Sequence, residues 1–241
     1  MSLLPRINAI WRDPLIVLVT ALLALLSVLF SVIDGSGRLQ HWCARSWARF
    51  IIWISRVQIE VVGFEELDFD RGYIFMANHL SMFDHWAFLA KLPCQFRFAA
   101  KASLFRIPFL GWHLRRAGNI PVDRHHPRRT LRSFQRVGEH IQRGISLVIY
   151  PEGGRTWGDK MDPFKRGPFV LATQARSPIV AVTFIGAHRR LERGSIVIYP
   201  GRMKMILHPP LEFEDYRSMD RQSLSDQVRD IIEKDYRQVP R

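Results

Sequence analysis

The chain has 241 residues, of which 47% are hydrophobic, and a formal net charge of +13 at pH 7. This length is sufficient for one sizeable domain with its own core plus a short appendage, and the hydrophobic content excludes a disordered chain. The positive charge indicates an anionic partner, which could be nucleic acid, an anionic membrane surface, or a substrate that carries phosphate or coenzyme A. Cys43 and Cys94 have no metal-binding spacing. We expect two reduced thiols, with a single disulfide between them as the alternative.

Residues 15–33 form a run of 19 residues without a charged side chain. As a helix this run would be about 28 Å long, close to the thickness of the hydrocarbon core of a bilayer. No cleavage site typical of a signal peptide follows it, so we expect a retained membrane anchor. A buried helix of a soluble core is the alternative.

Residues 42–62 combine tryptophans and aliphatic side chains with arginines, a composition typical of a helix that lies in the membrane interface. Arginines are more frequent after the apolar run, at Arg38, Arg45, Arg49 and Arg56, than before it, at Arg6 and Arg12. The positive-inside rule therefore predicts that the rest of the chain lies on the cytoplasmic face of the membrane, which we expect to be a bacterial inner membrane. We expect residues 1–56 to form membrane-associated helices and residues 57–241 to form one domain.

Strands and helices alternate in the predicted domain, residues 57–241. Short β-branched or aromatic runs predict strands at residues 57–62, 73–77, 95–100, 145–150, 179–185, 195–199 and 203–207. Helical patterns lie at Leu131, Phe134, Val137 and Ile141, at residues 165–174, and at Leu224, Val228, Ile231 and Ile232. This alternation predicts an α/β fold with a mixed, partly parallel sheet flanked by helices.

The stretch N-H-L-S-M-F-D-H-W follows the second predicted strand. Ser81 and Asp84 form a capping-box pattern, which predicts a helix that begins at Ser81 and runs toward Leu92. His79 then lies in the turn before the helix, where the Asp84 carboxylate can reach its imidazole. Asn78 is expected to shape this turn.

A carboxylate that binds one ring nitrogen of a histidine leaves the other nitrogen as a neutral base. No serine or cysteine nucleophile accompanies the pair, so the nucleophile would belong to the substrate, as an alcohol that attacks an activated acyl group. The alternative is that Asp84 only caps the helix. A metal site is a further alternative, because His79, Asp84 and His85 are three possible ligands. However, a binuclear hydrolase would have a histidine at Ser81, and the nearest additional candidates are His125 and His126.

Three further blocks lie beside apolar segments. G-N-I-P-V-D-R at residues 118–124 and Y-P-E-G-G-R-T at residues 150–156 place charged side chains at the end of such a segment, and P-I-V-A-V at residues 178–182 opens another buried strand. With the His-x4-Asp block they resemble, in order and spacing, the glycerophospholipid acyltransferase family, most closely its bacterial 1-acylglycerol-3-phosphate acyltransferases. The resemblance covers roughly residues 57–211, and the N-terminal apolar segment is also similar.

The resemblance implies that His79 is the catalytic base and that Asp84 orients it. It also implies that Arg124, Glu152 and Arg155 serve the phosphate and glycerol of the acceptor. Independently of the family, the planar fork of an arginine suits a phosphate group.

Other residues of these blocks add to the predicted site or depart from the family pattern. Gly153 permits close approach of the backbone to an anion, and Lys101 can add charge. Gly154 replaces the usual threonine of the third block, which leaves the identity of the acceptor open, and Ala181 stands where proline is common in the fourth. Lys165 and Gly167 are expected to start a helix that supports the site.

We therefore expect a membrane-bound O-acyltransferase that moves an acyl chain from a thioester of coenzyme A or acyl carrier protein to the free hydroxyl of 1-acylglycerol-3-phosphate, giving phosphatidate. Membrane lipids, the lysophospholipid and the acyl donor are the expected partners, and no nucleic acid, metal or cofactor is expected. The alternatives are acylation of glycerol-3-phosphate or of a lysolipid without phosphate, and a non-catalytic basic protein that binds membranes or nucleic acid.

Overall fold

The structure is a computed structural model that describes residues 4–123, 137–157 and 161–237. Its strands are β1 (Val57–Val62), β2 (Ile74–Ala77), β3 (Phe96–Lys101), β4 (Ile120–Val122), β5 (Ser146–Ile149), β6 (Ile179–Ile185) and β7 (Gly201–Leu207). Its helices are α1 (Leu4–Ile33), α2 (Arg38–Ile54), α3 (Met82–Lys91), α4 (Leu110–Arg116), α6 (Gly167–Ala175), α7 (Phe213–Tyr216) and α8 (Arg221–Arg237), with short 3-10 turns η1 (Phe64–Glu66) and η2 (Ala102–Arg106).

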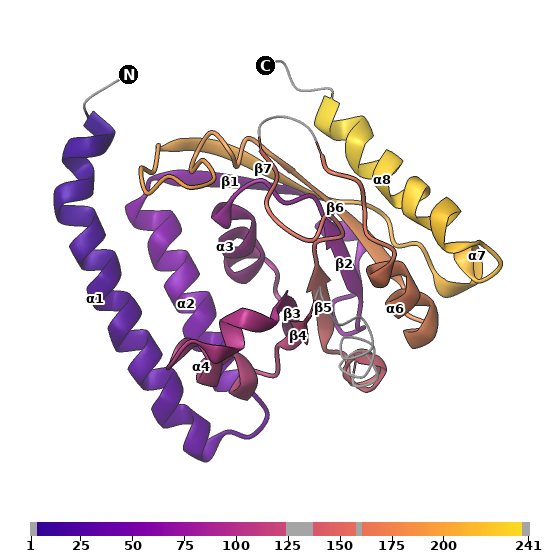
Figure 1. Cartoon of the computed structure of the whole chain (residues 1–241), viewed down its shortest axis with the longest axis horizontal. Coiled ribbons are helices and arrows are strands. Elements are labelled where there is room, and N and C mark those ends of the chain that lie inside the picture. Colours follow the sequence, from indigo (N-terminus) through magenta and orange to yellow (C-terminus); the bar gives the residue numbers. More distant parts are fainter. Residues whose placement is uncertain (1–3, 124–136, 158–160, 238–241) are drawn as a thin grey trace.

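The described strands form one sheet in the order β1-β7-β6-β2-β5-β3-β4, with helices on both faces (Figure 1). Every neighbouring pair is parallel except β6 and β7, which are antiparallel. The predicted α/β class with a mixed, partly parallel sheet is confirmed.

The central strands are apolar because they are buried on both faces. Phe75 and Ala77 of β2 belong to the core that α2 and α3 cover, whereas Ile74 and Met76 belong to the core that α6 and α8 cover. This two-sided burial explains why these strands read as nearly continuous apolar runs rather than as alternating ones.

The parallel arrangement decides where the polar blocks meet. The strands β6, β2, β5, β3 and β4 are consecutive neighbours and point the same way, so the segments that follow them leave the same edge of the sheet. Ligands of open α/β sheets bind outside this carboxyl edge. The residues directly after β2 and β5 contain the His-x4-Asp and Glu-Gly-Gly-Arg blocks.

Most predicted elements are present with boundary shifts of at most two residues, but one strand prediction is wrong. Residues 195–199 form no strand, because their backbone groups bond elsewhere. The Tyr199 amide donates to the Arg190 carbonyl at 2.8 Å, and the Ile198 carbonyl accepts from Arg12 Nη1 at 3.3 Å. In the helical pattern predicted over residues 131–141, Val137 and Ile141 are buried, and the rest of that pattern is largely outside the described residues.

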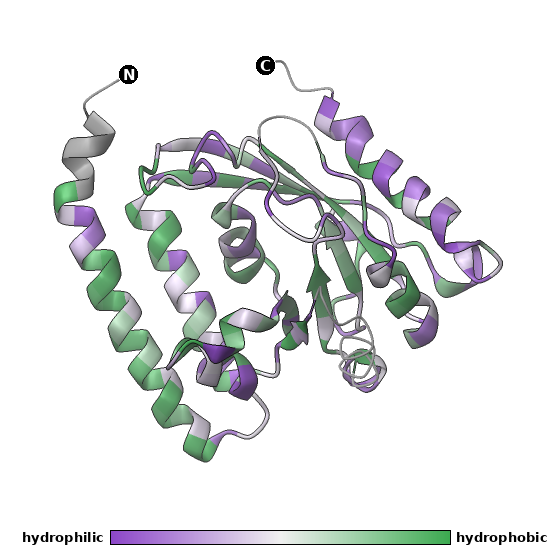
Figure 2. Cartoon of the chain, viewed as in Figure 1, coloured by the Kyte–Doolittle hydropathy of each residue, from purple (hydrophilic) through white to green (hydrophobic). Residues whose placement is uncertain are grey.

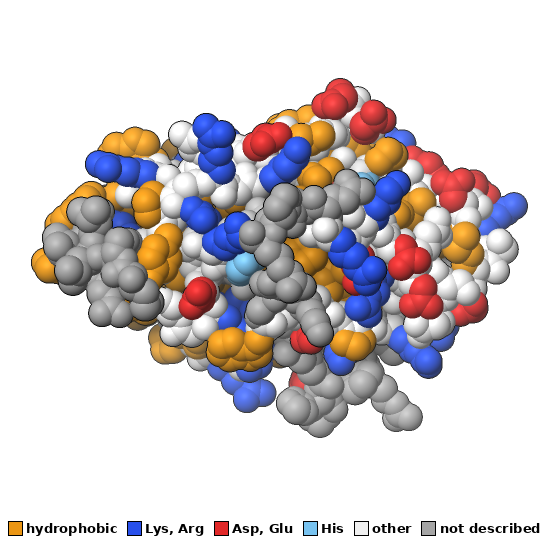
Figure 3. Space-filling model, turned by 90° about the horizontal axis from the view of Figure 1, so that it is seen from above, with side chains coloured by type: hydrophobic (Ala, Val, Ile, Leu, Met, Phe, Trp, Pro, Cys, Tyr) orange, Lys and Arg blue, Asp and Glu red, His pale blue; other side chains and the backbone are white. Residues whose placement is uncertain are grey.

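The helix α1 contains the predicted apolar run. Residues 10–33 are the one segment of the described chain that is long and apolar enough to cross a membrane, and only 11% of its most apolar window is buried. Such exposure does not fit the alternative of a buried core helix. Figure 2 shows α1 in green along most of its described length, and in Figure 3 apolar side chains reach the surface at the left edge, whereas acidic side chains lie mostly on the right, the side of α7 and α8.

Polar contacts nevertheless fix α1 to the rest of the protein. Trp47 Nε1 of α2 donates to Thr20 Oγ1 at 2.8 Å, and Ser27 Oγ lies 2.5 Å from His113 Nδ1 of α4. The helix α2 buries Ala48, Ile51 and Ile54 but leaves Trp42 and Trp53 exposed, in agreement with an interfacial position. Its residue Cys43 and the more distant Cys94 are both buried free thiols, so the alternative of a disulfide between them is wrong.

The exposed apolar surface of α1 predicts how the protein leaves a membrane. Hydrophobic burial is not screened by salt, so we expect detergent to extract the full chain from membranes and high salt to leave it there. Sedimentation of membranes followed by immunodetection distinguishes the two. Release of the full-length chain by salt alone would show that electrostatic attraction holds it.

Candidate active site

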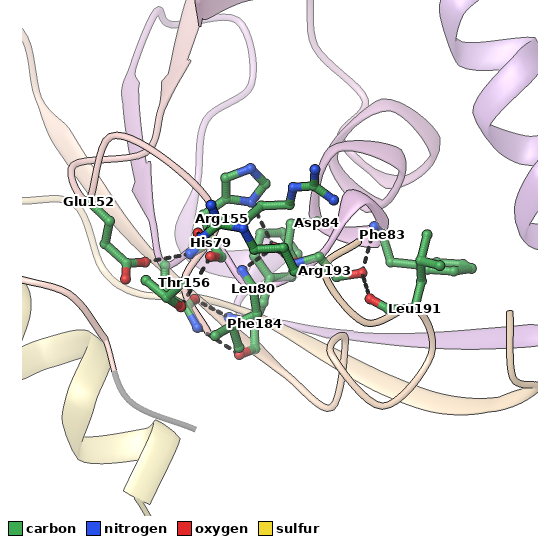
Figure 4. A network of polar contacts seen from close by, with 12 residues as sticks. His79, Leu80, Phe83, Asp84, Glu152, Arg155, Thr156, Phe184, Leu191 and Arg193 are labelled. Atoms are coloured by element: carbon green, nitrogen blue, oxygen red, sulfur yellow. Dashed lines mark hydrogen bonds and ion pairs between the residues drawn. The ribbon is translucent and has the colours of Figure 1, made fainter. Parts of the chain in front are cut away.

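His79 and Asp84 are in direct contact at the carboxyl edge of the sheet. His79 follows β2 after one residue, and Asp84 lies in the first turn of α3, which begins at the N-cap Ser81 as predicted. His79 Nδ1 lies 2.9 Å from Asp84 Oδ2 (Figure 4). A carboxylate at this distance assigns the proton to Nδ1, so the basic lone pair of a neutral imidazole is on Nε2.

One oxygen of Asp84 serves both the histidine and the helix. Besides His79 Nδ1, Asp84 Oδ2 accepts the backbone amides of Leu80 at 2.8 Å and Ser81 at 2.9 Å. Asp84 is fully buried, and burial raises the pKa of its carboxyl, while the Ser81 and Leu80 amides and the charges of His188 and Arg155 oppose that rise. The cap and the orientation of the imidazole therefore depend on the same carboxylate, so the two roles considered for Asp84 do not exclude each other.

Glu152 fixes the backbone of the histidine from the neighbouring strand β5. Its Oε1 accepts the His79 amide at 2.6 Å and its Oε2 accepts the Asp162 amide at 2.8 Å, with 4% of the residue exposed. Thr156 reinforces the link, because its amide donates to the His79 carbonyl at 2.9 Å. Both carboxylate oxygens thus have backbone partners, which makes Glu152 a residue that positions the His79 loop as well as one that lines the cavity.

Aromatic rings hold the plane of the imidazole. Tyr150 stacks on His79 with ring centroids 3.9 Å apart and an interplanar angle of 20°. His85 lies next to both rings, at 4.8 Å from each. Burial lowers the pKa of His85 well below its ordinary value, and the charges of His79 and Arg155 lower it further, so His85 is neutral.

The segment after β6 closes the other side of the site. Asn78 exchanges two hydrogen bonds with the backbone of Phe184 in β6, at 2.9 and 2.7 Å, which agrees with the prediction that Asn78 shapes the turn. Ser81 Oγ donates to the Leu191 carbonyl at 2.7 Å, and Arg193 Nη1 donates to the Arg155 carbonyl. Figure 4 shows Phe184, Leu191, Arg155 and Arg193 around the histidine.

A cavity of about 1600 Å³ extends from this site and is lined by residues of the helices α1 to α4 and α6, of β3 and of η2. It is larger than the roughly 300–1,000 Å³ of sites for drug-sized ligands. Most of its lining is apolar, and the larger apolar residues include Leu23, Trp47, Met82, Trp86, Leu89, Phe96, Phe98, Leu104, Leu110 and Leu114. Its polar lining includes His79, Lys101, Glu152, Arg155, Lys165 and Arg193. The cavity therefore combines a cationic end at the histidine with a long apolar part.

The structure brings together the predicted site residues that it describes. Lys101, Gly153 and Arg155 line the cavity with His79, and Gly153 has a φ of 78°, which glycine adopts without the strain that other residues would suffer. Gly154 also lines the cavity, whereas Ala181 is buried inside β6 opposite Met76. Arg124 lies outside the described residues, so its role stays a prediction.

The described residues contain no group of three or more histidine, cysteine, aspartate or glutamate side chains that could hold a metal ion. His125 and His126, the nearest candidates in the sequence, lie outside the described part. The expectation that no metal or cofactor is needed stays a prediction.

Sequence reasoning missed Arg193. Its guanidinium lies over the ring of the exposed Trp157, with Cζ 4.5 Å from the ring centroid, while it also bonds the Arg155 carbonyl. No motif marks it, because it belongs to a loop that only the parallel arrangement of β6 and β2 brings to this edge. The only sequence feature that could have indicated Arg193 is the arginine-rich run R-R-L-E-R at residues 189–193, after β6.

The family model named Acyltransferase matches residues 58–185, which is more than half of the chain. The chain therefore belongs to the acyltransferase family.

Several relatives have names that specify an acceptor. The chain is 29% identical over 176 residues to the chloroplastic 1-acyl-sn-glycerol-3-phosphate acyltransferase BAT2 of Brassica napus, with 72% of this chain and 51% of that protein covered. It is 27% identical over 179 residues to the 1-acyl-sn-glycerol-3-phosphate acyltransferase of Pseudomonas aeruginosa, covering 72% and 68%. With the enzyme of the same name from Saccharomyces cerevisiae it shares 28% identity over 237 residues, covering 95% and 78%. The chain spans about half the length of the plant relatives that it matches.

The fold is similar to that of a solved structure, the 1-acyl-sn-glycerophosphate acyltransferase PlsC from Thermotoga maritima. The TM-score is 0.79, the sequence identity is 19%, and the similarity covers 97% of this chain and 96% of that one. At this identity the similarity supports the fold alone.

The buried Glu152 predicts a specific pH dependence of stability. Burial raises its pKa to about 7 from an ordinary value of 4.5, against the opposing amides of His79 and Asp162. Between these pH values the native state binds a proton that the unfolded chain has released, so Glu152 makes the protein less stable as the pH rises from about 4.5 to about 7.

Glu152→Gln removes this titration. We expect the melting temperature of the variant in detergent to be lower, because an amide group faces the Asp162 amide, and to change less between these two pH values than that of the wild type. Glu214→Gln, at an exposed position of α7, is the matched control and should keep the wild-type slope. An unchanged slope in Glu152→Gln would show that Glu152 does not titrate there.

Proposed function

We propose that this protein transfers an acyl chain from an acyl thioester to the free hydroxyl of 1-acylglycerol-3-phosphate, giving phosphatidate. The observation that carries the proposal is the oriented His79–Asp84 pair at the cationic end of a large cavity whose remainder is apolar. The names of the relatives support the same acceptor.

In this proposal His79 is a general base. Its Nε2 takes the proton of the acceptor hydroxyl as that oxygen attacks the thioester carbonyl. The carbon–sulfur bond then breaks, and the thiolate leaves with the proton from the imidazolium. Asp84 stabilises the imidazolium in between and keeps Nδ1 protonated. Removal of a positioned base typically costs about 10²–10⁴-fold in rate.

The nucleophile belongs to the acceptor rather than to the protein. Ser81 is the hydroxyl closest to His79 along the chain, but its Oγ donates to the Leu191 carbonyl and accepts from the Phe83 amide at 3.3 Å. This hydroxyl is buried and occupied by the helix cap, so it supports direct transfer without an acyl-enzyme intermediate.

The two ends of the cavity suit the two parts of the substrates. The cations Arg155 and Lys101, with the Gly153 turn, suit the phosphate of the acceptor, because charge-assisted hydrogen bonds to phosphate are strong. The apolar part suits an acyl chain, which carries no group that needs a polar partner. The donor can be coenzyme A or acyl carrier protein. Membrane attachment through α1, with the domain on the cytoplasmic face, completes the proposal.

Gly154 favours a second acceptor as the alternative. A threonine at this position would place a hydroxyl in the lining of the cavity, and glycine removes it. A lysolipid without phosphate, or glycerol-3-phosphate, is therefore the competing acceptor.

The mechanism predicts that His79→Ala lowers kcat by about 10²–10⁴-fold while the melting temperature and membrane attachment stay close to wild type. Asp84→Asn should also lower kcat, because an amide does not hold the same tautomer. The double variant should lose little more than His79→Ala alone, because the two residues act as a unit. The assay follows the thiol released from acyl coenzyme A with lysophosphatidate as acceptor.

Two outcomes would overturn this mechanism. Wild-type activity in His79→Ala would exclude the histidine as the base. Loss of activity on chelation, restored by zinc, would favour the metal hypothesis.

The acceptor assignment predicts a selective effect of Arg155. A charge-assisted hydrogen bond contributes about 1.5–3 kcal/mol, which corresponds to about 10- to 150-fold. We expect Arg155→Ala to lower kcat/KM for lysophosphatidate by this factor and to change slow acylation of a phosphate-free lysolipid much less. Arg155→Lys should retain only part of the wild-type kcat/KM for lysophosphatidate, since lysine lacks the planar fork of arginine.

The matched control is Arg166→Ala, an exposed arginine at the N-cap of α6 that is not part of the cavity lining. This variant should leave kcat/KM unchanged for both acceptors. If Arg155→Ala lowers kcat/KM equally for both acceptors, Arg155 has a structural role and does not bind the phosphate. A wild-type preference for the phosphate-free lysolipid would favour the alternative acceptor.

A further inference from the structure

A second apolar surface lies beside α1 and is not explained by the core. The turn between η2 and α4 exposes Ile107 by 47% and Phe109 by 70%, and the first turn of α4 exposes Leu110 by 40% and Trp112 by 42%. We name residues 107–112 the apolar ridge. Most of the large apolar side chains that the described residues expose lie either on α1 or on this ridge. Exposed apolar patches of this kind mark interaction sites.

The ridge is a rigid feature rather than a loose loop. Gly111 lies so close to η2 that a Cβ atom there would be 2.2 Å from the Phe105 carbonyl oxygen, and its amide donates to the Ile107 carbonyl at 2.7 Å. Arg115 also donates to the Phe105 carbonyl. Phe109 has a φ of 61° and a ψ of −54°, an unfavourable conformation for a bulky residue. The fold thus holds a phenylalanine outward in a conformation that brings it no burial within the protein.

The position of the ridge indicates what covers it. The helix α4 contacts α1 (Figure 1), and His113 next to Trp112 bonds Ser27 of α1, so the ridge lies beside a helix that exposes apolar side chains of its own. Arg106 and Arg116 are exposed on either side of the ridge. Apolar and tryptophan side chains bordered by arginines fit a bilayer, in which the arginines reach anionic headgroups.

We propose that the apolar ridge is a second membrane contact, which inserts into the interface of an anionic bilayer beside α1. Three residues of the ridge, Pro108, Phe109 and Leu110, also line the cavity. This contact therefore places the rim of the cavity at the membrane surface. The inference rests on surface exposure and charge, and it holds whether or not the proposed acyl transfer is correct. An acidic carrier protein that covers the same ridge is the rival occupant.

The test must report locally, because α1 by itself can keep every variant on the membrane. A cysteine at Phe109→Cys carries an environment-sensitive fluorophore, while the native Cys43 and Cys94 are buried. Met219→Cys, at an apolar position between α7 and α8 that is 40% exposed, is the control away from α1. Both full-length variants are reconstituted into vesicles of phosphatidylethanolamine and phosphatidylglycerol, and their melting temperatures are compared with wild type.

We expect the fluorophore at 109 to lose quenching by aqueous iodide and to gain quenching by spin-labelled lipid, whereas the fluorophore at 219 stays open to iodide. Adding Arg106→Glu and Arg116→Glu should reduce lipid quenching at 109, and the control Arg217→Glu in the α7 region should not. Equal iodide quenching at 109 and 219 would overturn the proposal. Protection of position 109 only after acyl carrier protein is added would overturn it in favour of the rival.

Discussion

The carboxylate of Asp84 is the interaction on which the site depends. A single buried oxygen accepts the His79 imidazole and the amides of Leu80 and Ser81. The same atom therefore ends the strand-to-helix turn, caps α3 and fixes the imidazole tautomer. Its other oxygen, Oδ1, is buried without a hydrogen-bond partner among the described residues, which adds to the cost of ionisation that burial imposes. A substitution here removes a helix cap and the hydrogen bond that orients the His79 imidazole together.

The sheet supplies the second constraint, because it assembles the site from segments far apart in the sequence. Glu152 after β5 accepts the His79 amide, and the Leu191 carbonyl after β6 accepts Ser81 Oγ. The histidine turn is thus held from both neighbouring strands of β2. Catalysis that relies on orientation requires this kind of support, because a positioned base works only within a narrow geometry.

The division of the cavity into a cationic and an apolar part matches the chemistry of a lipid acceptor. The cations lie with the histidine at the carboxyl edge, and much of the apolar lining comes from α1 to α4, β3 and η2. The helix α1 is consequently both a candidate membrane segment and a wall of the cavity, which explains why Thr20 and Ser27 bond it to the domain. In the proposed function, attachment and substrate binding would therefore depend on the same helix.

The sequence by itself determined the elements and the chemistry that is local in the chain. Apolar runs predicted the strands because these strands are buried on both faces, and Ser81 with Asp84 predicted the start of α3 because a capping box is a local interaction. The reach of Asp84 to His79 also followed from that one turn. Motif order indicated the acyltransferase family before any contact was known.

Only the tertiary structure decided how distant segments combine. The strand order placed Arg193 beside Arg155, and no local pattern marks that residue. Residues 195–199 have the composition of a strand but gain no neighbour, because Arg12 and Arg190 take their backbone groups. Glu152 was predicted to serve the acceptor, yet its burial and its two backbone partners follow from the approach of β5 to β2. Local sequence specifies which groups are available, whereas sheet pairing between residues far apart in the chain determines which of them meet.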